Sequence, residues 1–288
     1  MTGTAASSTF ITAPDGLRLH VRRYGPRPGD AVPVVCLPGL ARTVADFEEL
    51  ALHLANDRCV IAIDARGRGR SEYDANPANY NLQVELADVL AVLTALEIAR
   101  AVFIGTSRGG IVTMLMAAAR PRAIAGCVLN DIGPVIEMEG LMRIKSYVGK
   151  LPQPASMHEG ADILRRLFAA HFPKLSDDDW VSFARRTFNE SDGRIVANYD
   201  ARLTTALKGV DAGRPLAPLW KEFDALARVP LMVIRGANSD ILSSATVEAM
   251  RARRTDLEVI EVADEGHAPH LAVPTTLSAV ATFIATVR

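Results

Sequence analysis

The most informative segment of this chain reads AVFIGTSRGGIVTMLMAAA and covers residues 101–119. Its first part is apolar and typical of a buried strand, and its last part repeats apolar residues at helical spacing. Between them stands the pattern G-x-S-x-G, with Ser107 flanked by Gly105 and Gly109. Side chains two positions from a sharp strand-to-helix bend would collide, so glycines there leave Ser107 exposed. The segment predicts a strand, a tight turn that carries a nucleophile, and a helix.

Similar strand-like runs recur on both sides of this segment. They cover residues 32–37, 59–63, 124–129, 230–235 and 257–262, and most are separated by helical patterns. This alternation predicts a mostly parallel sheet with right-handed crossovers and helices on its faces. Before it, Pro14-Asp15-Gly16 lies between two shorter strand-like runs and predicts an edge hairpin.

The strand rhythm breaks between residues 135 and 213. This region contains amphipathic segments, one of them opened by Ser176 and three aspartates, which is a good helix start. We therefore predict a helical lid over residues 135–213, inserted into a core formed by residues 1–134 and 214–288.

Composition and charge narrow the class of protein. Apolar residues make up 49% of the 288 residues, and the formal net charge is -1, which favours a globular fold and gives no global field for nucleic acid. No apolar run is long enough to span a membrane. Residues 1–8 lack the features of a signal peptide and read as a frayed tail, and the three cysteines lack CxxC spacing. We expect a cytoplasmic protein with reduced thiols.

A serine hydroxyl is a poor nucleophile near neutral pH and needs a hydrogen-bonded base. Among the six histidines, His267 directly follows the last predicted strand, where a loop can reach Ser107. His270 lies three residues further on and is the second choice. The base also needs a carboxylate to fix its tautomer. Asp240 follows the strand 231–235 and is our first choice, and Asp131, which ends the strand after the nucleophile helix, is the alternative.

Acyl transfer also needs N–H groups that stabilise the negative oxygen of the intermediate. One donor would be the backbone N–H of Arg108, directly after the serine. The other would be that of Leu40, in the turn Pro38-Gly39-Leu40 after an early strand.

Taken together, these residues resemble the α/β-hydrolase superfamily, in particular its lid-bearing serine esterase and lactonase-like branch. The resemblance is carried by Gly39, the segment DARGRGRS at 64–71, the elbow at 105–110, the segment 236–240 and Gly266-His267. It implies an α/β-hydrolase fold with a mostly parallel central sheet, flanking helices and an inserted lid, and a triad that works without metal or organic cofactor. The family usually has histidine before the oxyanion glycine, where this chain has Pro38.

The sequence thus predicts a serine hydrolase that cleaves small to medium carboxylic esters with an apolar acyl or alcohol part, through an acyl-enzyme. Lactone or carbon–carbon bond hydrolysis on the same triad is an alternative, and a small-molecule receptor with slow or no turnover is another. Interleaved charges in the lid do not indicate a strongly anionic substrate. Aromatic residues of the lid are candidates for the pocket wall: Tyr147, Phe168, Phe172, Trp180, Phe183 and Phe188.

Overall fold

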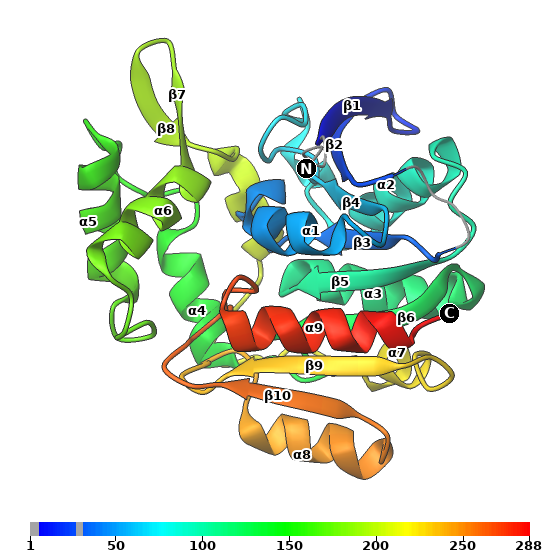
Figure 1. Ribbon diagram of the computed structural model, residues 1–288. Helices are drawn as coiled ribbons and strands as arrows, with labels where there is room; N and C mark the ends of the chain where they lie inside the picture. The colour runs from blue at the N-terminus through cyan, green and yellow to red at the C-terminus, as the bar shows by residue number, and fades with distance from the viewer. Residues whose placement is uncertain (1–5, 27–30) are drawn as a thin grey trace.

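The computed structural model describes residues 6–26 and 31–288, and its centre is an eight-stranded sheet (Figure 1). The strands follow the order β1-β2-β4-β3-β5-β6-β9-β10. The pairs β1/β2 and β2/β4 are antiparallel, and all other neighbours are parallel. The strands are β1 (Ser7–Thr12), β2 (Arg18–Tyr24), β3 (Val34–Leu37), β4 (Val60–Ile63), β5 (Ala101–Thr106), β6 (Ile124–Asn130), β9 (Leu231–Gly236) and β10 (Glu258–Val262). This mostly parallel sheet confirms the predicted α/β architecture.

The central strands are continuously apolar because both faces of the sheet are covered. In β3, Val35 and Leu37 belong to one buried cluster, whereas Val34 and Cys36 belong to the other. Neighbouring residues of a strand point to opposite faces, so a strand buried on both sides shows no polar alternation.

Helices form the two outer layers. Helices α1 and α9 pack on one face, and helices α2, α3, α7 and α8 supply apolar residues to the cluster on the other face (Figure 1). Their bounds are α1 (Glu48–Leu54), α2 (Leu82–Ala95), α3 (Arg108–Ala119), α7 (Trp220–Asp224), α8 (Ser244–Arg253) and α9 (Pro274–Thr286).

The chain between β6 and β9 leaves the sheet and returns to it, and we call it the β6–β9 segment. It contains α4 (Met138–Tyr147), α5 (Met157–Phe168), α6 (Asp177–Thr187) and the antiparallel hairpin β7 (Phe188–Ser191) with β8 (Arg194–Ala197). Ser176 caps α6 in a reciprocal capping box with Asp179, as its sequence predicts. Helices α5 and α6 share a buried cluster of their own, whereas Ile144 of α4 packs into the main core.

Two local expectations need correction. The predicted frayed tail of residues 1–8 is wrong at its end, because Ser7 already pairs with Arg23 in β1; residues 1–5 lie outside the described part. The β6–β9 segment is not purely helical, since Asp192-Gly193 turns the hairpin β7–β8. In the part of the chain described here, no helix has the length and apolarity needed to cross a membrane.

Candidate active site

Ser107 stands at the bend between β5 and α3 in a backbone conformation that non-glycine residues rarely adopt. Its φ is 51° and its ψ is -116°. The flanking glycines are required by close backbone contacts: a Cβ atom at Gly105 would lie 2.5 Å from Gly110 Cα, and one at Gly109 would lie 2.0 Å from the Leu37 carbonyl oxygen. The spacing G-x-S-x-G is therefore the steric condition for this bend.

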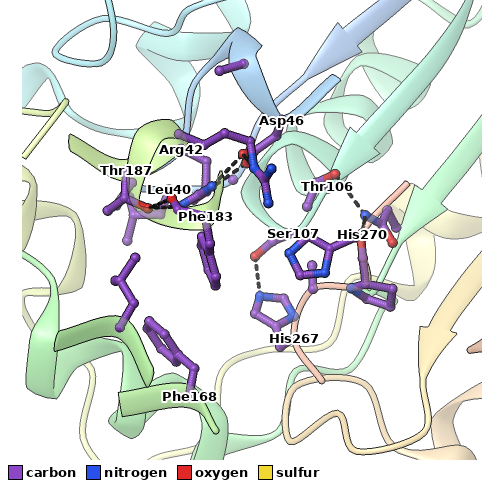
Figure 2. A pocket seen from close by; sticks show the side chains of 18 of the residues that line it. Leu40, Arg42, Asp46, Thr106, Ser107, Phe168, Phe183, Thr187, His267 and His270 are labelled. Carbon is purple, nitrogen blue, oxygen red and sulfur yellow. Dashed lines mark hydrogen bonds and ion pairs between the residues drawn. The ribbon is translucent and has the colours of Figure 1, made fainter. Parts of the chain in front are cut away.

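His267 lies between the serine and a carboxylate, and Figure 2 shows its contact with the serine. Its Nε2 is 2.9 Å from Ser107 Oγ, and its Nδ1 is 2.8 Å from Asp131 Oδ2. The loop after β10 supplies the histidine, and the residues directly after β5 and β6 supply the other two groups. Because these strands are parallel, their carboxyl ends lie at one edge of the sheet, where the three side chains meet.

Asp131 is fully buried, and its hydrogen-bond partners come from β9 and from the loops after β9 and β10. Besides His267, its carboxylate accepts hydrogen bonds from the Gly236 N–H at 2.9 Å and from the Ser239 hydroxyl at 2.6 Å. These two donors fix the orientation of the carboxylate and hold it toward the imidazole.

Asp240, our first choice from the sequence, is bound elsewhere, and this assignment needs correction. Arg143 of α4 donates from Nε and Nη2 to its two oxygens, at 2.5 and 2.8 Å. Burial acts to raise the pKa of Asp240, but these bonds and the charge of Arg143 outweigh it and lower the pKa. The carboxylate hydrogen-bonded to His267 is that of Asp131, the alternative.

The two predicted oxyanion donors lie beside the serine, and within the described part of the chain their N–H groups are free to bind an oxygen. Leu40 lines the same cavity as Ser107, and Arg108 is the first residue of α3. Among the described residues, neither backbone N–H has a hydrogen-bond acceptor.

An ionic bridge that was not predicted from the sequence connects the residues Leu40 and Arg108. Arg68 Nε donates to the Leu40 carbonyl oxygen at 2.7 Å, and Arg68 Nη1 forms an ion pair of 2.8 Å with Glu85 Oε1. Glu85 Oε2 accepts from Arg108 Nε at 2.6 Å. Arg68 and Glu85 are 1% and 4% exposed, so solvent hardly screens their charges. The bridge ties the turn after β3 to the start of α3.

Ser107 and His267 open onto a cavity of 240 Å³. The structure places four of the predicted aromatic residues in its wall: Tyr147, Phe168, Phe172 and Phe183. Burial raises the pKa of Tyr147 to about 12, so its hydroxyl stays neutral. The remaining two, Trp180 and Phe188, are buried in the cluster of α5 and α6 instead, where Trp180 stacks on Phe183 with ring centroids 6.0 Å apart.

His270, the second candidate for the base, lies in the same cavity, but the serine is hydrogen-bonded to His267 and His270 is hydrogen-bonded to Glu265. Its Nδ1 is 2.8 Å from Glu265 Oε2, and its ring packs against Phe172 and Phe183. The cavity also contains two guanidinium groups, Arg42 and Arg186, that sequence reasoning did not single out. No sequence pattern indicated them: Arg42 simply follows a turn, and Arg186 lies in a helix that contains several other charged residues. In residues 6–26 and 31–288 no cluster of three metal-binding side chains is present.

Comparison with known proteins gives a consistent family. The sequence profile of the Alpha/beta hydrolase family matches residues 34–280. The chain is 30% identical over 276 residues to a 3-hydroxybutyrate-oligomer hydrolase of Cupriavidus necator, covering 92% of both chains. It is 26% identical to a 2-(acetamidomethylene)succinate hydrolase of Mesorhizobium japonicum, covering 93% of this chain and 92% of that one. The crystal structure of an alpha/beta hydrolase from Novosphingobium aromaticivorans superposes with a TM-score of 0.91 at 39% identity, covering 99% of both chains.

Proposed function

Because the chain belongs to the alpha/beta hydrolase family, and is thus a hydrolase, we propose that it is a serine hydrolase of carboxylic esters. Ser107 would be the nucleophile, His267 the base and Asp131 the group that orients the base. The observation that carries the proposal is the pair of hydrogen bonds of His267, 2.9 Å to Ser107 and 2.8 Å to Asp131. A weak nucleophile, its base and an orienting acid within direct contact constitute the arrangement that activates serine.

The mechanism follows from these contacts. Ser107 Oγ attacks the ester carbonyl while its proton moves to His267 Nε2, and Asp131 stabilises the imidazolium through Nδ1. The N–H groups of Leu40 and Arg108 bind the oxyanion of the tetrahedral intermediate. His267 then protonates the departing alcohol, and water, activated by the same imidazole, hydrolyses the acyl-enzyme. The free amides and the ionic bridge that fixes their positions support this assignment.

The cavity and one relative support an ester as substrate. Its wall is partly aromatic, which suits apolar acyl or alcohol parts of small to medium size. The relative from Cupriavidus necator acts on oligomers of a hydroxy acid, and hydroxy acids join to each other through ester bonds. In this proposal the β6–β9 segment is the lid, since α4, α5 and α6 all contribute to the wall.

Active-site labelling tests the proposal. A fluorophosphonate should add to Ser107 of the wild-type protein, with the modified peptide identified by mass spectrometry, and 4-nitrophenyl butyrate should be hydrolysed. Ser107→Ala should lose both reactions while its melting temperature stays close to that of the wild type. Labelling without turnover of any ester, lactone or diketone would favour a receptor, and full activity of Ser107→Ala would refute the assignment.

A further inference from the structure

Two guanidinium groups line the cavity of Ser107, and both lie within 4 Å of the carboxylate of Asp46. Arg42 comes from the turn after β3, and Arg186 comes from the last turn of α6. Their side chains are 22% and 23% exposed. A Cβ atom at Gly39 would touch both Ser107 Cβ, at 3.7 Å, and Arg42 Cγ, at 3.4 Å. Arg42 therefore begins beside the nucleophile and extends along the cavity.

Arg42 is already held by the protein (Figure 2). Its Nε and Nη2 donate to the two oxygens of Asp46, at 2.7 and 2.5 Å, and its Nη1 donates to Thr187 Oγ1 at 2.6 Å. The charge of Arg42 is balanced by this carboxylate, and its head is fixed in one orientation.

Arg186 has no such partner. Its Nε lies 3.7 Å from Asp46 Oδ1, too far for a hydrogen bond, and within the described residues its guanidinium has no hydrogen-bond acceptor. Burial lowers its pKa; the charge of Asp46 opposes this effect, and that of Arg42 adds to it. Arginine nevertheless stays protonated at neutral pH.

The other acids of the cavity do not cancel this charge. Glu48 forms an ion pair of 2.6 Å with Arg22, and Glu49 is exposed at the rim, where water screens it. Two guanidiniums thus share the single carboxylate of Asp46, which leaves one positive charge in a half-buried, partly aromatic cavity.

We propose that Arg186, supported by Arg42, binds a carboxylate of the substrate, so that the preferred esters carry a free carboxylate group away from the bond that is cleaved. The proposal rests on the proposed function, because it concerns the same cavity. One unbalanced charge suits a monoanion, and the planar guanidinium of Arg186 offers the paired N–H groups that a carboxylate accepts. The proposal departs from the expectation, based on interleaved charges along the sequence, that a strongly anionic substrate is not indicated.

Matched ester pairs test the proposal. In one pair the acyl part differs, 4-nitrophenyl hydrogen adipate against its terminal primary amide; in the other the alcohol part differs, 4-acetoxybenzoate against 4-acetoxybenzamide. We expect kcat/KM to favour the acid over the amide by about tenfold or more in at least one pair, the value of a charge-assisted hydrogen bond. Arg186→Gln should raise KM for the acids, so that acid and amide are then hydrolysed with similar kcat/KM. Arg185→Gln, on the exposed side of the same helix, is the control and should behave like the wild type.

A binding measurement separates this proposal from the proposed function. Adipamate, the monoanion with one carboxylate and one amide, should raise the melting temperature of the wild type and of Arg185→Gln more than adipamide does, but not that of Arg186→Gln, whether or not esters are hydrolysed. Hydrolysis of the amides without any preference for the acids, or a preference that persists in Arg186→Gln, overturns the carboxylate subsite and leaves the esterase intact. Adipamate binding that depends on Arg186, without fluorophosphonate labelling, overturns the esterase and leaves the subsite.

Discussion

Replacement of Asp131 by asparagine should nearly abolish turnover in a protein that still folds. The carboxylate accepts three hydrogen bonds, from Gly236, Ser239 and His267. An asparagine that keeps the bond from the Gly236 N–H through its oxygen must direct its NH2 group toward His267. The imidazole then accepts at Nδ1 and carries its proton on Nε2, where it cannot take the proton of the serine.

This change of tautomer determines how much kcat should fall. The same substitution in a related catalytic arrangement costs about 10⁴ in kcat, equivalent to about 5.5 kcal/mol of transition-state stabilisation. Asp240→Asn is the matched comparison, because Asp240 is bound to Arg143 and not to His267. We expect it to change kcat by less than about tenfold, or 1.4 kcal/mol.

The assay measures initial rates with 4-nitrophenyl butyrate at roughly neutral pH, together with the melting temperature of each variant. A loss of turnover in Asp131→Asn without unfolding, and its near absence in Asp240→Asn, is the expected result. If both variants fold and Asp240→Asn loses more activity, the assignment of the acid from the hydrogen bonds of His267 is wrong.

Three further predictions concern stability. Gly109→Ala should destabilise the fold by about 3 kcal/mol or more in urea unfolding, because its Cβ would lie 2.0 Å from the Leu37 carbonyl oxygen; a loss below about 1 kcal/mol would contradict the steric argument. Glu85→Gln should cost about 3–5 kcal/mol, since it leaves the buried guanidinium of Arg68 and the partly exposed one of Arg108 without this counter-charge; unchanged stability would show that the bridge contributes nothing. The pair of Asp240 with Arg143 stabilises the fold at pH values above the unfolded carboxyl pKa of about 4, and this contribution is lost as the pH falls through the lowered folded pKa. The melting temperature of the wild type should therefore exceed that of Asp240→Asn at pH 7 and converge with it toward pH 3, whereas a constant difference would argue against the pair.

The sequence was sufficient for the features that depend on local pattern. Buried strands read as apolar runs, and the steric demands of the bend at Ser107 appear directly as glycines at fixed positions. The order of serine and histidine along the chain followed from the order of the strands. These features require no knowledge of how distant segments dock.

The acid could not be chosen in this way. Asp131 and Asp240 both follow strands and both give the chain order serine, aspartate, histidine. What distinguishes them is Arg143, which α4 brings to Asp240, together with the Gly236 N–H and the Ser239 hydroxyl that hold Asp131. Such contacts depend on how α4 and the loop after β9 dock on the core, and no periodicity along the chain encodes that placement.

The sequence also could not show which aromatic residues of this region would line the cavity. Trp180 and Phe183 lie three residues apart on one helix, yet Phe183 lines the cavity and Trp180 is buried behind it. The hairpin β7–β8 carried a local signal, the pair Asp192-Gly193, that the helical interpretation of this region overlooked.

The groups that would break the bond belong to the sheet, whereas much of the cavity wall belongs to the β6–β9 segment. The proposed reacting groups and much of the proposed substrate-binding surface thus lie in different parts of the chain. Grafting the segment from another member of the family would transplant selectivity and preserve the chemistry. Contacts such as Arg143 with Asp240 and Thr187 with Arg42 limit that freedom, because they join the segment to the core, and a successful graft would need to exchange both members of each pair together.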